Sequence, residues 1–297
     1  MNNRFETRTT GKWILAGEHS VLRGFPALVF PLKSKSLRMV FEPQSSGLEL
    51  AMGEGFGPEF RVLFWSLLEK ACTLADFSIQ KISGRIYFES DIPVGSGLGA
   101  SASLCVAVTH WFRTSGLISQ EQEPAFARNL ENIFHGESSG VDVAVVLSEQ
   151  GLHYERNGIS TPLKPNWEPI WGLTDTGQKG MTYDCVRQVK DLYQSAPELG
   201  IQLDQQMGEA VRLCESGLLA SQRDGFERLA SGINLAGNCF EQWGLVTQRA
   251  QDLMSEIREA GAVAVKPTGS GGGGFILSLW PVPWPESMSA KIIACPV

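Results

Sequence analysis

Residues 93–108 read PVGSGLGASASLCVAV, and this stretch is the most informative part of the chain. Three glycines, Gly95, Gly97 and Gly99, occupy alternate positions just after the strand-like segment RIYFES. From Leu104 onward apolar residues recur at helical spacing, so the loop opens onto a helix N-terminus. Glycine permits a close approach of backbone N–H groups to an anion, and the helix dipole favours negative charge there. The stretch therefore predicts a phosphate-binding loop. Hydroxyls suited to phosphate oxygens or a phosphate-bound Mg²⁺ are those of Ser96, Ser101 and Ser103.

Two familiar phosphate loops do not match this stretch. The chain contains no GxxxxGK[ST] motif, and the third glycine comes one residue too early for the dinucleotide fingerprint GxGxxG. Taken alone, the loop also fits a second interpretation, in which glycines form a turn and small residues let a helix pack tightly.

Composition restricts the class of protein. The 297 residues are 43% hydrophobic and 19% charged, which is typical of a globular protein with a large core. A formal net charge of −7 without a basic run argues against nucleic-acid binding. The six cysteines form no CxxC pair and are interpreted as reduced core residues. Neither a secretory signal nor a membrane-length apolar segment is present, so we expect a cytoplasmic protein without a membrane partner.

The order of patterns along the chain predicts an α+β protein of two layered domains, 1–165 and 166–297. Residues 12–50 are typical of strands separated by turns, including PALVFPL and SLRMVFEP as two segments. Helical periodicity appears near 60–76, 121–134 and 184–260.

A second glycine cluster, KPTGSGGGGFILSL, covers residues 266–279 between two apolar strands. Its glycines are Gly269 and Gly271–Gly274. Four consecutive glycines are costly in conformational entropy, and the close approach of a ligand or another chain segment would explain them. A flexible linker is the alternative.

Two further segments carry candidate chemistry. In HGESSGVDVAV, residues 135–145, Asp142 lies in an apolar run, where an ionised carboxylate needs a reason to be present. A helix start at Ser138, with Asp142 in the first turn, is the competing interpretation. In GKWILAGEHSVLRGFPAL, residues 11–28, Lys12 precedes an apolar strand, and Glu18 and His19 follow it.

Together the four segments resemble the GHMP small-molecule kinases, the family of galacto-, homoserine, mevalonate and phosphomevalonate kinases. The matching order is K-x-x-L-x-G-E-H, P-x-G-x-G-L-G-x-S, E…HG…SG-[IV]-D and K-x-T-G-x-G-G-G-G, over residues 11–279. Within the family, GEHSVLRGFPAL, HGESSGVD and LTDTGQKGMTYDCV look most like the mevalonate kinase branch, with Thr182 at a threonine position of that pattern.

The resemblance implies a ribosomal protein S5 domain 2-like N-terminal domain and a ferredoxin-like C-terminal domain. It also implies ATP- and Mg²⁺-dependent transfer of the γ-phosphoryl group to a primary alcohol, mevalonate above all. By matching position, the catalytic residues would be Asp142 and Lys12, and the metal ligands Ser101 and Glu131. ATP would be bound by Pro93, Gly95, Ser96, Gly97, Leu98, Gly99, Ala100, Ser101 and Ser103. The acceptor would be bound by Glu18, His19, Gly140, Thr182, Gly269, Gly271 and Gly272.

Departures from the family pattern concern the acceptor more than the reaction. Thr9-Thr10 replaces the usual Ala-Pro before Gly11-Lys12, and Ser138 replaces a proline of the mevalonate kinase pattern. Because mevalonate is an anion, Lys12, His19 and Lys179 are the candidate cations. A kinase for phosphomevalonate, a sugar or homoserine is one alternative, and a catalytically silent nucleotide-binding regulator is another. A homodimer is considered, although no motif fixes the oligomeric state.

Overall fold

The computed structural model describes residues 3–45, 47–53, 56, 58–135, 138–156 and 158–296. The chain divides into two compact units that are discontinuous in sequence. Unit 1 comprises residues 1–11, 32–93 and 99–148, and unit 2 comprises 12–31, 94–98 and 149–297. The two units are defined by contacts within the structure, and each is made of three separate chain segments. The predicted division of the chain after residue 165 stays a prediction.

The strands of unit 1 carry its core on one face. Strands β1 (Phe5–Ala16) and β2 (Ala27–Pro43) each pass from one unit into the other along the chain. In unit 1, β4 (Gly84–Ser90) pairs antiparallel with β2, and β3 (Leu48–Met52) pairs parallel with β4. Alternation along these strands buries one side of the sheet, as at Phe41, Phe88 and Met39.

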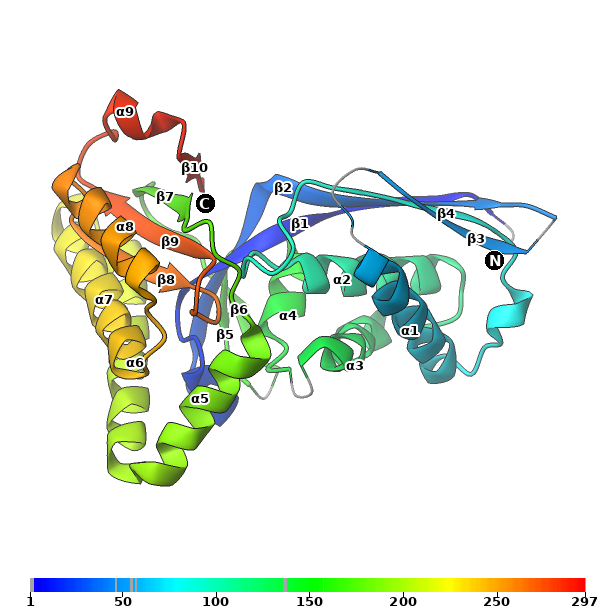
Figure 1. The fold of residues 1–297 in the computed structure, drawn as a ribbon, viewed down its shortest axis with the longest axis horizontal. Helices are drawn as coiled ribbons and strands as arrows, with labels where there is room; N and C mark the ends of the chain where they lie inside the picture. Colours follow the sequence, from blue (N-terminus) through cyan, green and yellow to red (C-terminus); the bar gives the residue numbers. More distant parts are fainter. Residues whose placement is uncertain are drawn as a thin grey trace. The chain divides into compact units, whose positions relative to one another are not determined.

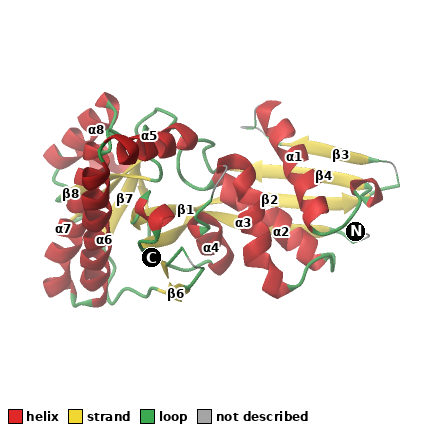
Figure 2. Ribbon diagram, turned by 90° about the horizontal axis from the view of Figure 1, so that it is seen from below, coloured by secondary structure: helices red, strands yellow, loops and turns green. Residues whose placement is uncertain are grey.

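The helices of unit 1 cover that buried face of the sheet (Figures 1 and 2). They are α1 (Pro58–Leu74), α2 (Ala100–Thr114), α3 (Glu123–His135) and α4 (Val141–Ser148), with 3-10 turns η2 (Ile79–Lys81) and η3 (Gln120–Gln122). Helix α2 is buried along most of its length, and its Trp111 packs on Phe41 of β2 with ring centroids 4.8 Å apart. Burial of these large rings supplies much of the hydrophobic stabilisation of unit 1.

Unit 2 contains an antiparallel sheet in the order β10-β7-β9-β8. Its strands are β7 (Ile170–Asp175), β8 (Ala264–Thr268), β9 (Phe275–Trp280) and β10 (Ile292–Ala294). The second glycine cluster forms the connection between β8 and β9, as the sequence predicts. The short strands β5 (Leu152–Tyr154) and β6 (Ser160–Pro162) pair with each other, and β5 pairs with the start of β2; the turn η1 (Ser20–Arg23) follows β1.

Helices pack beside this sheet of unit 2 (Figure 2). They are α5 (Thr182–Ser195), α6 (Pro197–Leu219), α7 (Gln222–Gln242), α8 (Gln248–Glu259) and the short α9 (Glu286–Ser289). Helices α6 and α7 approach closely because glycines meet at their contact. A Cβ added at Gly225 would lie 2.0 Å from the carbonyl oxygen of Gly217.

The observed elements confirm the α+β class and correct one detail of the predicted strands. PALVFPL and SLRMVFEP form the single strand β2 instead of two strands. Pro31 fits because it lies between the segment that pairs with β5 and the segment that pairs with β4. Its missing N–H therefore interrupts neither of these ladders. Across the described part of the chain, no helix is long and apolar enough to cross a membrane.

Candidate active site

The first glycine loop has the backbone that its sequence predicts. Gly95, Gly97 and Gly99 have φ values of +76°, +81° and +85°, and α2 begins directly afterwards at Ala100. The left-handed conformation at these positions favours glycine over residues with a Cβ atom. The loop is joined to β1 in unit 2, where the backbone N–H of Lys12 donates to the Leu98 carbonyl oxygen at 2.9 Å.

Ser103 has a structural position just inside α2. Its side chain is fully buried, and its hydroxyl lies 2.6 Å from the Thr10 carbonyl oxygen and 2.9 Å from that of Gly99. Both oxygens are acceptors, so the hydroxyl holds the helix start against β1 within unit 1. Ser101, one turn earlier than Cys105 on α2, is half-buried.

Glu131 of α3 acts through its charge on Cys105 of α2, one helical turn after Ser101. Its charge raises the pKa of Cys105, an effect second to burial of that thiol, so the carboxylate lies near Cys105. Residues i and i+4 share a helix face, so Ser101 and Cys105 lie on the same side of α2. Glu131 is itself buried, and it accepts a hydrogen bond from the hydroxyl of Ser138.

The start of α4 is built by the serines that precede it. The Ser138 hydroxyl accepts from the Gly140 N–H at 3.0 Å, and the Ser139 hydroxyl accepts from the Val141 N–H at 3.3 Å. Asp142 therefore occupies the first turn of α4, as the capping interpretation predicts. A carboxylate there also interacts favourably with the helix dipole. Gly136 and Glu137 of this motif lie outside the described residues.

The second glycine loop packs directly against the first, within unit 2. A Cβ at Gly97 would lie 3.2 Å from the Thr268 carbonyl oxygen, and one at Gly269 would lie 3.1 Å from the Gly97 Cα. A Cβ at Gly274 would lie only 2.5 Å from the Ser96 carbonyl oxygen. Close approach of chain segments thus explains the glycines. Most of the loop is buried, so it is not a surface linker.

Other segments close around the second loop. A Cβ at Gly272 would meet the Cys185 sulfur at 2.8 Å, and one at Gly271 would meet Leu245 Cβ at 2.9 Å. Lys179 lies over the first loop, because a Cβ at Gly95 would be 3.7 Å from its Cδ. Lys179 was predicted as a cation for the acceptor. The structure places its side chain beside the predicted phosphate loop.

Glu18 pairs with a residue to which the sequence analysis gave no role. Its Oε1 lies 2.5 Å from the ammonium nitrogen of Lys266, the first residue of the KPTG segment, and both side chains are buried. Burial raises the pKa of Glu18, while Lys266 and, more weakly, Lys12 oppose that rise. The partner could not be read locally, because 248 residues separate the pair.

His19 is a neutral buried side chain, which corrects its prediction as a cation. Its ring lies edge-to-face with Trp243, at 5.2 Å between centroids, and Nε2 is 2.9 Å from the Ser270 carbonyl oxygen. Since a carbonyl only accepts, Nε2 carries the hydrogen. Burial lowers the pKa of His19 to about 4, against the opposing hydrogen bond to Ser270. Ser270 also contacts Thr182, with their hydroxyl oxygens 3.3 Å apart.

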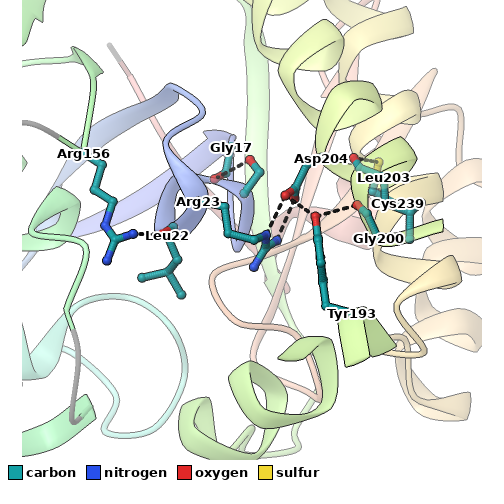
Figure 3. Close-up of polar contacts among 10 residues, drawn as sticks. Gly17, Leu22, Arg23, Arg156, Tyr193, Gly200, Leu203, Asp204 and Cys239 are labelled. Carbon is teal, nitrogen blue, oxygen red and sulfur yellow. Dashed lines mark hydrogen bonds and ion pairs between the residues drawn. The ribbon is translucent and has the colours of Figure 1, made fainter. Parts of the chain in front are cut away.

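A charged cluster that sequence reasoning missed fixes the turn after His19 (Figure 3). The Arg23 guanidinium donates two hydrogen bonds to Asp204 of α6, at 2.5 and 2.6 Å, and lies 4.3 Å from the centroid of the Tyr193 ring. The Tyr193 hydroxyl also donates to Asp204. Burial and this hydrogen bond raise the pKa of Tyr193 to about 12, so it remains a donor. Bidentate pairing and ring stacking together hold η1 against α5 and α6.

The predicted residues thus gather in two groups, one in each unit. Unit 1 brings the start of α2, Glu131 and the start of α4 together. Unit 2 brings Lys12, the two glycine loops, His19 and Thr182 together. The chain itself joins the groups, because Leu98 of unit 2 is bonded to Gly99 of unit 1.

Known proteins share both the sequence pattern and the fold. The model of the GHMP kinases N terminal domain matches residues 63–150. A mevalonate kinase of Pyrococcus horikoshii is 30% identical to this chain, covering 91% of it and 87% of the relative. A mevalonate kinase of Pyrococcus furiosus is 28% identical over 95% of this chain and 91% of the relative. The crystal structure of L. major mevalonate kinase in complex with R-mevalonate has a TM-score of 0.76 at 22% identity, covering 94% of this chain and 87% of that one.

The relatives that match over nearly the whole chain define the class of this protein as a small-molecule kinase. The extent of these matches shows that the chain belongs to the GHMP kinase family. Within that family, the relatives that match over nearly their whole length are mevalonate kinases.

The buried His19 predicts a pH-dependent stability. The unfolded imidazole has a pKa near 6.5, whereas the folded one has a pKa of about 4. Below pH 6.5 the unfolded chain gains a proton that the folded chain does not, so stability falls as pH decreases toward 4. Between pH 7.5 and pH 5 this group should lower the free energy of unfolding by about 2 kcal/mol. Urea unfolding of wild type and His19→Gln across this range checks the difference. A difference independent of pH would contradict a buried neutral His19.

The Arg23 cluster predicts a stability loss on neutralising Asp204. Asp204→Asn leaves the guanidinium without its counter-charge, and the free energy of unfolding should fall by about 2 kcal/mol. Glu209→Gln is a matched control on α6, because Glu209 pairs with Arg212 at the exposed surface and should cost less than about 0.5 kcal/mol. Denaturant unfolding measures both. If both variants lower the free energy of unfolding by the same amount, the Arg23 cluster does not stabilise the fold more than an exposed ion pair does.

Proposed function

We propose that this protein is an ATP-dependent mevalonate kinase, which transfers the γ-phosphoryl group of ATP to the primary alcohol of mevalonate. The observation that carries the proposal is the match to mevalonate kinases over more than nine-tenths of the chain. Family membership supports ATP as the phosphoryl donor.

The first glycine loop and the start of α2 would bind the ATP phosphates. Residues 95–99 have backbone conformations that let N–H groups converge, and α2 adds the positive end of its dipole. Lys179, whose side chain lies beside Gly95, would add a positive charge to the same loop. Ser103 would act by holding α2 in place, since its hydroxyl already bonds to backbone carbonyls.

Mg²⁺ fits the oxygen donors of unit 1. Ser101 lies one helical turn before Cys105, whose thiol is affected by the charge of Glu131, and a hydroxyl with one carboxylate is a set that Mg²⁺ accepts when phosphates complete its shell. Within the described ranges no three His, Cys, Asp or Glu side chains gather as a metal site, so we assign no all-protein cage. When bound, the ion would neutralise phosphate charge and orient the triphosphate.

Asp142 and Lys12 would serve the transfer itself. The alcohol oxygen forms a bond to the γ-phosphorus, the bond from that phosphorus to the bridging oxygen of ADP breaks, and the alcohol proton passes to the Asp142 carboxylate. Lys12 would stabilise negative charge on the phosphoryl group during transfer. Both roles depend on positioning, which the first turn of α4 and the β1 backbone supply.

The acceptor would be bound by residues of unit 2 around Ser270. His19 and Thr182 contact Ser270 from two different segments. Gly140, at the start of α4, stays a sequence-based candidate for acceptor binding. Since His19 is neutral, it would act as a hydrogen-bonding group rather than as a cation for the mevalonate carboxylate.

Measuring ADP release across acceptors tests the proposal. Mevalonate should give a kcat/KM well above those of phosphomevalonate, homoserine and galactose. A higher value for another acceptor would transfer the assignment to a sister kinase. No release with any of them, together with retained ATP binding, would favour a silent regulator. A homodimer, a cytoplasmic location and the absence of nucleic-acid partners stay predictions.

Replacing the proposed proton acceptor should slow the chemical step. Asp142→Asn should lower kcat by on the order of 10²–10⁴ with little change in KM for ATP, because the amide cannot take the proton. Steady-state ADP release measures this, with the surface variant Asp252→Asn as the matched control. Near-normal turnover in Asp142→Asn would remove the residue from the mechanism.

Removing either proposed metal ligand should raise the Mg²⁺ requirement. Ser101→Ala and Glu131→Gln should each increase the Mg²⁺ concentration for half-maximal activity by about tenfold or more. Calorimetric binding of a non-hydrolysable ATP analogue, titrated with Mg²⁺, gives a readout independent of turnover. Glu123→Gln on the same helix is the control. An unchanged Mg²⁺ dependence in both variants would show that Ser101 and Glu131 do not bind the ion.

A further inference from the structure

Lys266 is a fully buried ammonium group beside the second glycine loop. Its nitrogen lies 2.5 Å from Glu18 Oε1 and 3.4 Å from the Ile14 carbonyl oxygen, and 5.3 Å from the centroid of the Phe240 ring. None of its side-chain surface is exposed. A buried charge of this kind is costly unless it is paired, and an apolar residue would fill a core strand more cheaply. The presence of a charged lysine at this buried position therefore indicates that the charge of Lys266 has a function.

The Glu18 carboxylate is affected by the charge of a second lysine, Lys12, as well as by Lys266. The carboxylate lies at the end of β1, six residues after Lys12, and is buried. Within the described part of the chain, its second oxygen is buried and receives no hydrogen bond. Lys12 acts on the Glu18 carboxyl through its charge, as does Lys266. One carboxylate thus lies under the influence of two ammonium groups.

The charges of these three residues sum to one positive charge. Two ammonium groups and one carboxylate sum to a net +1 within this group of three residues. Without Lys266, the ionised Glu18 would cancel the charge of Lys12 and draw it toward β1. Opposite charges in a buried setting interact strongly, so such a rearrangement would compete with phosphate.

We propose that Lys266 is a positioning residue for phosphoryl transfer, which neutralises Glu18 and so keeps the positive charge of Lys12 directed at the transferred phosphoryl group. This assignment rests on the proposed kinase function. It also gives Glu18 a role as the counter-charge between two lysines rather than as a ligand of the acceptor.

The other ionisable groups that interact with Glu18 and Lys266 do not replace Lys266 as the counter-charge of Glu18. Cys214 of α6 and Cys239 of α7 interact electrostatically with Glu18 and Lys266. Burial raises the pKa of both thiols, so they remain neutral. Asp204, which acts on Cys239, is already paired with Arg23.

A charge-balanced pair of variants tests the proposal. Lys266→Met should lower kcat at pH 8 by about tenfold or more, since one electrostatic contribution to the transition state is lost. The double variant Lys266→Met/Glu18→Gln restores the net +1 on Lys12 and should recover kcat to within about threefold of wild type. In the single variant the loss should be smaller at lower pH, because burial raises the pKa of Glu18 and Lys266, the main opposing charge, is gone.

Controls separate this role from a structural one. Lys291→Met removes a lysine whose 2.5 Å pair with Glu256 is exposed, and it should leave kcat unchanged. Thermal melting and ADP binding, measured on every variant, report folding independently of turnover. If Lys266→Met does not fold, the double variant, which buries no charge at this pair, still reports kcat.

Three results decide the outcome. An unchanged kcat in Lys266→Met at every pH would overturn the proposal. A folded double variant with a kcat as low as that of the single variant would also overturn the proposal, because the loss of activity would then be structural. The same holds if the single variant does not fold and the folded double variant has a low kcat. A wild-type protein that releases no ADP with mevalonate would instead refute the proposed substrate, and the same variants would be compared with the acceptor that wild type does phosphorylate.

Discussion

The contact between the two glycine loops of unit 2 is the constraint on which the candidate site depends. Gly97 and Gly269 lie so close that a side chain on either would press against the other backbone, and Gly274 has the same relation to Ser96. Because no Cβ atoms separate the loops, their backbones define one surface rather than two. Strand β8 reaches this contact from one side and β1 from the other, since the N–H of Lys12 bonds to Leu98. Ordering these glycines costs conformational entropy, and the tight backbone contact that they permit fixes the geometry of the two loops.

In unit 1, the candidate residues gather around the start of α2, which follows the first glycine loop directly in the sequence. The first loop continues without a break into α2, so the direction of its last residues sets where that helix begins. Within unit 1, the charge of Glu131 acts on Cys105 of α2, and the Ser138 hydroxyl links Glu131 to the start of α4. Within unit 1, Glu131 and the start of α4, which carries Asp142, are therefore linked by a short local contact. A kinase that works mainly by positioning needs such coupling.

Much of the site could be predicted because its signals are local. Alternate glycines before a helical pattern gave the first loop, and serines before an apolar run gave the start of α4. Charge states and long-range pairs could not be predicted in this way. The neutrality of His19 follows from Trp243 and Phe240 around it, and the Lys266–Glu18 pair depends on how β8 meets the end of β1. Likewise, Pro31 signals a break in sequence, but its place between two paired segments leaves β2 continuous.

The distribution of buried charge explains how an acidic chain can handle anionic substrates. The net charge of −7 is a property of the whole chain, whereas a phosphate responds to charges within about one Debye length. In unit 2 each buried carboxylate described here has a cationic partner: Asp204 has Arg23, and Glu18 has Lys266. These pairs remove the local repulsion that a buried carboxylate would exert on phosphate. Lys12 and Lys179 then act on a background that is close to neutral, so a few cations suffice where the surface is acidic.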